Sequence, residues 1–320
     1  MTNQELLLKQ IRKRQAPDAS LIDAIATVLQ VSYDAAHRRV SLKSRFSIDE
    51  TITLCTHFGI SMDSLFRNDE VVLTRKTAEI RTPDDMARYL KESAQNIGMF
   101  ATMNGARMFY SAKDIPLFHM VGGTLLSKFK IYVWLNLLSG EGLHSRFEDF
   151  TVSVPLLEHG EALRKVYNSL EVHEIWNDTT INSTLQQLYY FYKSGLLSLN
   201  SAALLCADLA QVLTDAETRC CKEGSRYHLY YNELLILNNN VLITAPQKQS
   251  LFVPYTLLGY FITDDAATCS NTERFFGQQI KNSMLLNSSG ARDRKVFFNR
   301  GHQKIESYLQ RMRTESETGF

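Results

Sequence analysis

The sequence predicts an α+β fold that is predominantly helical, with an all-helical N-terminal domain followed by a helical domain that contains a small antiparallel sheet. Three observations support this prediction. Apolar residues recur at helical spacing through most of the chain. Within residues 227–262 the pattern changes to runs rich in β-branched and aromatic residues. At 320 residues the chain exceeds the usual size of one core, which indicates about two domains.

The composition is that of an ordinary globular protein with nearly balanced charge. Hydrophobic residues make up 44% and charged residues 22% of the chain. Because the formal net charge is only +1, no overall field attracts nucleic acid, and any DNA binding requires a local basic patch. One such patch lies between Ala35 and Ser47, where there are four basic residues and no acidic residue.

Several functional classes are disfavoured by the motifs. The five cysteines lack CxxC spacing, which argues against a disulfide framework and a zinc site. The eight histidines are scattered, so we expect no metal and no cofactor. GxSxG, P-loop and GxGxxG motifs do not occur, and we expect no enzymatic activity. The polar N-terminus and the lack of an apolar stretch of roughly 18 residues lead us to expect a cytoplasmic protein without a membrane partner.

Capping residues divide the N-terminal region into short helices. Ser20 and Ser32 each precede an apolar-periodic segment and can accept a hydrogen bond from a free backbone N–H. Ser47 and Glu50 form a capping box, and Gly59 is a typical left-handed C-cap. These signals predict helices at 3–14, 21–29, 33–41 and 50–58.

The turn between the second and third predicted helices has a recognisable pattern. Ala26 is small where the two helices would cross, and Leu29, Val31 and Ser32 match a Leu-Gly-Val-Ser turn. The later sequence GISMDSL at 59–65 matches a second helix–turn unit. Together these features resemble the helix-turn-helix domain of Cro and phage-repressor-type regulators, especially the BetR-like variety.

The resemblance implies a sequence-specific DNA-binding transcription regulator that binds double-stranded DNA as a homodimer. Three positions depart from the family pattern. Gln30 occupies the usual glycine position of the turn and must accept an unfavourable backbone geometry. Ala36 replaces a β-branched core residue, and Arg39 stands where such families often carry a hydrophobic residue.

Helical periodicity sorts the residues of the third helix by face. Tyr33, Ala36 and Val40 should pack on the preceding helix, whereas Arg38 points away and is the best candidate for a bidentate guanine contact. Arg39 and the basic residues after the helix suit phosphate contacts. The complete set of candidate DNA-binding residues is Ser32, Tyr33, Asp34, Ala35, His37, Arg38, Arg39, Ser41, Lys43 and Arg45.

The predicted domain organisation is a helix-turn-helix domain at 1–70, a linker at 71–82 and an effector-sensing or dimerisation domain at 83–320. A helical domain around a small antiparallel sheet loosely resembles the sensor domains of one-component regulators, including GAF- and PAS-like folds. The last helix carries an apolar stripe that could pair with its twin in a homodimer; its residues are Ile305, Tyr308, Leu309 and Met312.

The sheet of this second domain is predicted from three segments. A strand is expected at 106–111. Two β-rich runs within 227–245 are joined by Asn238–Asn240, and asparagine favours the tight turn of a hairpin. A further strand at 250–262 contains Pro254, which favours an edge position or a bulge.

Four consecutive aromatic residues, Tyr-Tyr-Phe-Tyr at 189–192, would cover every side of a helix. Part of this run should therefore face a cavity, another domain or a second subunit. We predict a ligand pocket formed by Trp176, Tyr190 and Tyr192, whose occupant would be a small-molecule effector or a protein partner.

A protein–protein adaptor that uses the N-terminal helices to recognise a partner is the alternative function. The two functions differ in their salt dependence, because neutralising several DNA phosphates releases counterions and makes the affinity fall steeply with salt.

Overall fold

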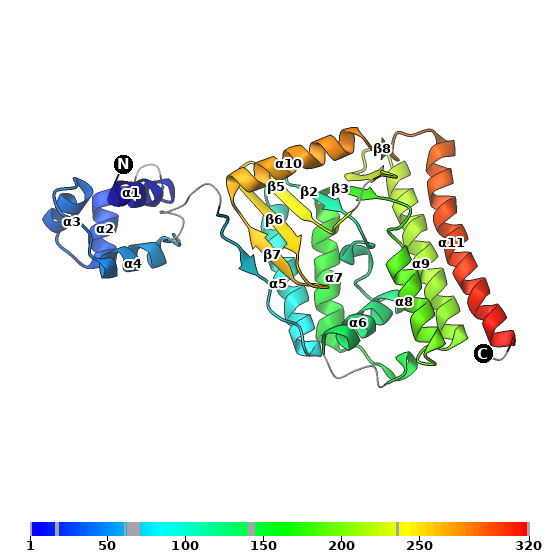
Figure 1. The fold of residues 1–320 in the computed structure, drawn as a ribbon. Coiled ribbons are helices and arrows are strands. Elements are labelled where there is room, and N and C mark those ends of the chain that lie inside the picture. The colour runs from blue at the N-terminus through cyan, green and yellow to red at the C-terminus, as the bar shows by residue number, and fades with distance from the viewer. Residues whose placement is uncertain are drawn as a thin grey trace. The chain divides into compact units, whose positions relative to one another are not determined.

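The computed structural model describes residues 2–16, 19–60, 62, 71–139, 145–234 and 237–318. The chain divides into two compact units, Met1–Leu73 and Thr74–Phe320, and each is described by itself (Figure 1). Helices and one mixed sheet make a mixed α/β protein, consistent with the α+β class that the sequence predicts. Within the described ranges, none of the helices combines the length and the apolar character needed to cross a bilayer.

The N-terminal unit is built from short capped helices. Thr2, Ser20, Ser32 and Ser47 accept a backbone hydrogen bond at the start of successive helices, which confirms the three caps predicted from the sequence. The helices are α1 (Asn3–Lys13), α2 (Leu21–Leu29), α3 (Tyr33–Val40) and α4 (Ile48–His57). Their shared core consists of Leu7, Leu8, Ile11, Ile25, Ala36, Leu54, Cys55 and Ile60. Most of the GISMDSL segment lies outside the described residues.

Gln30 joins α2 to α3 in a left-handed conformation, with φ 54° and ψ 42°. The turn is closed by a hydrogen bond from the Val31 N–H to the Ala26 carbonyl at 3.0 Å. The unfavourable geometry expected at this position is therefore present, because a Cβ atom in the left-handed region crowds the backbone.

Gln30→Gly is expected to stabilise the N-terminal unit by about 1 kcal/mol, since glycine adopts this conformation without a steric penalty. Amide hydrogen exchange in α2 and α3 of the full-length chain should slow by about fivefold. The matched variant Gln30→Ala keeps the Cβ atom and should give no such protection. Equal protection by both variants would contradict the explanation.

The C-terminal unit contains long helices and short strands (Figure 1). The helices are α5 (Pro83–Ala101), α6 (Leu125–Leu138), α7 (Val154–Ser169), α8 (Asn182–Lys193), α9 (Leu199–Cys221), α10 (Ala266–Lys281) and α11 (Ala291–Glu317). The strands are β1 (Arg75–Lys76), β2 (Arg107–Ser111), β3 (Glu171–Trp176), β4 (Tyr227–Tyr231), β5 (Val241–Ala245), β6 (Lys248–Pro254), β7 (Tyr260–Thr263) and β8 (Met284–Leu285).

The prediction of a small antiparallel sheet was wrong. Among the described residues, one eight-stranded sheet has the order β1-β7-β6-β5-β2-β3-β4-β8. Strands β2, β3 and β4 pair in parallel, and the other pairs are antiparallel. The parallel pairs are possible because α6 and α7 connect β2 to β3, and α8 and α9 connect β3 to β4. The loose resemblance to GAF- and PAS-like sensors depended on a small antiparallel sheet, so the larger mixed sheet does not support it.

The predicted hairpin within 227–245 is also wrong. Strand β4 lies between β3 and β8, whereas β5 lies between β2 and β6. Asn239 does adopt a positive φ of 62°, but its N–H donates to the Ser111 carbonyl at the end of β2. The segment predicted as one strand at 250–262 forms β6 and β7, which pair with each other, and Pro254 is the last residue of β6.

Part of the predicted linker belongs to the sheet. Strand β1 pairs with β7 through the neighbours Arg75–Ile262 and Lys76–Phe261. The Thr77 N–H extends this contact by donating to the Tyr260 carbonyl at 3.0 Å. The C-terminal unit therefore begins at Thr74, ahead of the boundary at 83 that the sequence suggested.

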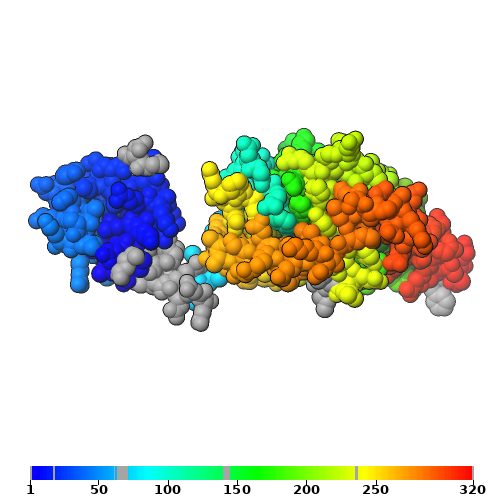
Figure 2. Space-filling model, turned by 90° about the horizontal axis from the view of Figure 1, so that it is seen from above, coloured from blue at the N-terminus to red at the C-terminus, as the bar shows by residue number. Residues whose placement is uncertain are grey.

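Different helices cover the two faces of the sheet. Because successive strand residues point to opposite faces, Met108 and Tyr110 join the large core formed with α5–α9 and α11, whereas Phe109 faces the other side. There α10 covers the sheet through Cys269 and Phe276. Figure 2 shows the outer surface of α10 in orange.

Two tyrosines in the aromatic run of α8 form hydrogen bonds with α11. The Tyr189 hydroxyl donates to Glu315 Oε1 at 2.6 Å, and the Tyr192 hydroxyl donates to the Met312 carbonyl at 2.8 Å. Phe191 is buried, while Tyr190 is 57% exposed. The apolar stripe of α11 that we expected to pair with a second copy is largely buried within the chain, because Ile305, Leu309 and Met312 belong to the core.

Candidate functional site

The exposed face of α3 carries most of the residues expected to contact DNA. Asp34, His37 and Arg38 are exposed, and so are the residues of the following turn, Ser41, Lys43 and Arg45. Ser32 caps the helix by accepting from the Ala35 N–H at 3.3 Å. The exposed side chains therefore include the basic residues Arg38 on α3 and Lys43 and Arg45 in the turn after it.

The packing predicted for α3 holds at one position and fails at another. Ala36 is completely buried, as expected for the face against α2. Tyr33 instead is 55% exposed and stacks on His37, with ring centroids 6.5 Å apart. Helical periodicity alone places Tyr33 on the inner face, but more than half of this side chain is exposed.

Arg39, for which a phosphate contact is predicted, is paired within the N-terminal unit. Its Nη2 lies 2.6 Å from Glu50 Oε1 and its Nε lies 3.1 Å from Oε2, while Nη1 donates to the Ala35 carbonyl at 3.0 Å. The hydrogen bond from Arg39 also lowers the pKa of Glu50. This half-buried bidentate pair ties α3 to the start of α4.

A contact that the sequence did not reveal fixes the turn after α3. The Gln4 side chain donates to the carbonyls of Arg39 and Ser44 and accepts from the Phe46 N–H. The three bonds span 2.8–3.2 Å. Helix α1 thereby positions the loop that carries Lys43 and Arg45, which no local pattern around Gln4 could have indicated.

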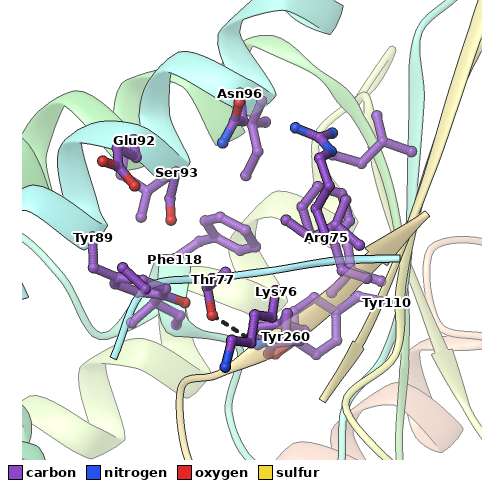
Figure 3. A pocket seen from close by; sticks show the side chains of 18 residues that line it. Arg75, Lys76, Thr77, Tyr89, Glu92, Ser93, Asn96, Tyr110, Phe118 and Tyr260 are labelled. Carbon is purple, nitrogen blue, oxygen red and sulfur yellow. Dashed lines mark hydrogen bonds between the residues drawn. The ribbon is translucent and has the colours of Figure 1, made fainter. Parts of the chain in front are cut away.

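The C-terminal unit contains a pocket of about 240 Å³ between α5 and the sheet. Its inner wall is mainly apolar and aromatic, with Leu117, Phe118, Leu163, Val241, Ile243, Phe252 and Ile262. In Figure 3, β1 runs across the cavity. The polar side chains that α5 contributes to the pocket lie above β1 in this view. These polar side chains are Glu92, Ser93 and Asn96.

Three tyrosines contribute hydroxyl groups to the pocket. Burial raises the pKa of Tyr89, Tyr110 and Tyr260, so the phenols are neutral hydrogen-bonding groups at neutral pH. The Thr77 side chain accepts from the Tyr260 N–H at 3.0 Å, the contact drawn in Figure 3. An apolar cavity with a few fixed polar groups is typical of a small-molecule site.

A buried polar cluster lies on the same side of the sheet. Glu174 is completely buried and accepts from Tyr167 at 2.6 Å, Tyr227 at 2.9 Å and the Trp176 indole at 2.9 Å. His119 Nε2 lies 3.1 Å from both carboxylate oxygens. Burial alone would raise the pKa of Glu174, but the interactions with His119 and Tyr167 outweigh it and lower the pKa.

The predicted ligand-pocket residues do not come together. Trp176 is completely buried and bound to Glu174, Tyr190 is exposed, and Tyr192 is bonded to the carbonyl of Met312 on α11. The pocket beside α5 was missed because its walls come from segments far apart in the sequence. No local signal in β2 pointed toward it, because four consecutive residues of this strand are buried and burial does not alternate between its faces.

We compared the chain with known proteins. No protein-family model, curated protein or solved structure matches the chain.

Proposed function

We propose that this chain is a cytoplasmic transcription regulator whose N-terminal unit binds double-stranded DNA through α3. The observation that supports this most directly is that one basic residue near α3 is paired with an acidic residue while the others are exposed. Arg39 is paired with Glu50, whereas Arg38 on α3 and Lys43 and Arg45 in the turn after it are exposed. A surface of this kind offers one side chain for a base edge and others for phosphates.

The dimensions of α3 suit this role. The helix has 8 residues, which corresponds to a length of about 12 Å, similar to the width of the major groove. Helix α2 packs against α3, and the Gln30 turn sets the angle between them. This arrangement supports the helix-turn-helix assignment made from the residues of the turn.

Selection from random duplex DNA tests the proposal. Full-length protein is titrated with the pool at two salt concentrations, and the enriched sequences are read. We expect enrichment of a palindrome and an affinity that falls steeply with salt, because a homodimer places two helices on successive half-sites. Absence of enrichment at both salt concentrations, with and without added extracts of small metabolites, would favour the adaptor function.

We further propose that the pocket beside α5 binds the effector, a small and largely apolar molecule with a hydrogen-bonding group. Strand β1 forms part of the pocket and continues directly into the segment that leads to the N-terminal unit. An effector that changes the pairing of β1 with β7 would therefore act on the connection between the units.

Ser93→Phe is expected to fill the pocket and abolish binding of a small apolar fluorescent probe such as anilinonaphthalene sulfonate. Ser93 lines the cavity from α5, so a phenyl ring there would occupy the space that the probe needs. Fluorescence titration of the full-length protein measures the effect. Ser270→Phe, an exposed position on α10, is the matched control and should leave probe binding unchanged. Equal binding by both variants would place the probe elsewhere.

A further inference from the structure

We propose that Glu171, His173 and His228 form a binding site for a divalent transition-metal ion, with Zn²⁺ as the best-matched ion. One carboxylate and two imidazoles are borderline ligands that this ion prefers, and three protein ligands leave a coordination position open. The sequence argued against a metal site because its histidines are far apart, but the fold brings two of them together.

The parallel pairing of β3 and β4 creates the cluster. His173 and His228 are direct neighbours in the register, and Glu171 points to the same face as His173 because it lies two residues earlier on the strand. One ligand atom from each residue lies within 4.8 Å of the others.

The distances are close to those that coordination requires. His173 Nε2 lies 3.1 Å and His228 Nε2 lies 3.9 Å from Glu171 Oε1. Ligand atoms bound tetrahedrally to Zn²⁺ at the usual bond lengths are separated by about 3.3 Å. Small side-chain adjustments would therefore bring the three atoms onto one ion.

His173 is held in place for this role, while His228 has room to move. The His173 ring is stacked on Phe109, with centroids 4.9 Å apart, and its side chain is only 12% exposed. The ring of His228 stacks on the other side at 4.6 Å and is nearly parallel to it. Since a metal binds in the plane of an imidazole ring, the His228 ring must turn toward the ion, and its 28% exposure permits this rotation.

A metal-binding histidine usually makes a hydrogen bond through the ring nitrogen that does not hold the metal, and Tyr230 supplies this partner for His173. Its hydroxyl lies 3.2 Å from His173 Nδ1. When Nε2 holds the ion, Nδ1 carries the proton and donates it to this hydroxyl, which can accept as well as donate. Tyr230 is thus a positioning residue for the ligand tautomer.

The charges around the cluster are compatible with a cation. Arg107 is the neighbour of Glu171 in the sheet register, but its guanidinium is paired with Glu273 of α10 at 2.9 Å. The carboxylate of Glu171 faces the two imidazoles and is 37% exposed. An ion that enters from solvent would therefore meet one carboxylate and two imidazole rings.

Titration of the untagged full-length protein with Co²⁺ tests the site, followed by competition with Zn²⁺. We expect one Co²⁺ per chain with visible d–d absorption bands, and loss of these bands when Zn²⁺ displaces it. His228→Gln and Glu171→Gln should each lower the affinity by at least about tenfold, and Tyr230→Phe should lower it less. His159→Gln on α7 is the control and should bind like the unchanged protein.

Thermal unfolding of each variant without metal shows whether the fold is retained, and added Zn²⁺ should raise the melting temperature of the unchanged chain but not of His228→Gln. Absence of Co²⁺ bands in the unchanged protein would overturn the proposal. The same conclusion would follow if folded His228→Gln and Glu171→Gln bound the ion as tightly as His159→Gln. DNA binding is measured separately and does not affect either result.

Discussion

Replacing Glu174 with leucine is expected to destabilise the C-terminal unit by about 3–5 kcal/mol, because removing one member of a buried charged cluster leaves its partners unpaired. The hydroxyls of Tyr167 and Tyr227 and the indole of Trp176 all donate to this carboxylate. Leucine has a similar volume but accepts no hydrogen bond, so these buried donors would lose their acceptor. Urea unfolding followed by tryptophan fluorescence measures the change.

Two matched substitutions separate the charge from the hydrogen bonds. Glu174→Gln keeps one acceptor oxygen and should lose about 1–3 kcal/mol. Glu171→Gln lies on the same strand, but its side chain is 37% exposed, so it should change the stability by less than about 0.5 kcal/mol. If Glu174→Leu were no more harmful than Glu171→Gln, the cluster would not contribute to stability as described.

The same carboxylate makes stability depend on acidity. The pKa of Glu174 is lowered from its ordinary value of 4.5, so its contribution is present above pH 4.5 and is lost as the pH falls through the folded-state pKa. Below pH 4.5 the unchanged protein should therefore lose stability more steeply than Glu174→Gln, whose amide does not titrate.

The N-terminal unit could be predicted in detail because its signals are local. A serine precedes the start of each of three predicted helices by no more than three residues. The structure confirms that Ser20, Ser32 and Ser47 are the caps. The left-handed geometry at Gln30 follows in the same way from its place in the turn. By contrast, the contact of Gln4 with Ser44 joins positions 40 residues apart and leaves no local trace.

The C-terminal sheet was harder to predict because its strands pair across long helical connections. The segment Glu171–Trp176 does not alternate polar and apolar residues, because one face carries the half-buried His173 with Ile175 and the other carries the fully buried Glu174 with Trp176. Hydrophobic periodicity predicts which residues are buried. It does not predict that Glu174 accepts a hydrogen bond from Tyr227 or that His173 lies beside His228 in the sheet.

Arg38→Ala is expected to lower the affinity for the selected DNA by about 5- to 140-fold while leaving non-specific DNA nearly unaffected. This corresponds to about 1–3 kcal/mol for loss of a bidentate base contact. Lys43→Ala should weaken all duplexes to a similar degree and reduce the salt slope by about 1, because a phosphate contact carries no sequence information. Fluorescence anisotropy on selected and scrambled duplexes measures both. Lys295→Ala on α11 is the control for loss of one positive charge.

Arg39 provides the sharpest contrast, because it follows Arg38 in the chain and yet is bound to Glu50. Arg39→Ala should destabilise the N-terminal unit. The further change Glu50→Ala should cost less than it does in the unchanged protein, because only its capping-box contact with the Ser47 N–H is then left to lose. At a temperature where the variant is folded, it should still distinguish the selected sequence. If Arg38→Ala instead weakened every duplex equally and Arg39→Ala abolished discrimination, Arg39 would be the base-reading residue, and its contact with Glu50 would have to open when DNA binds.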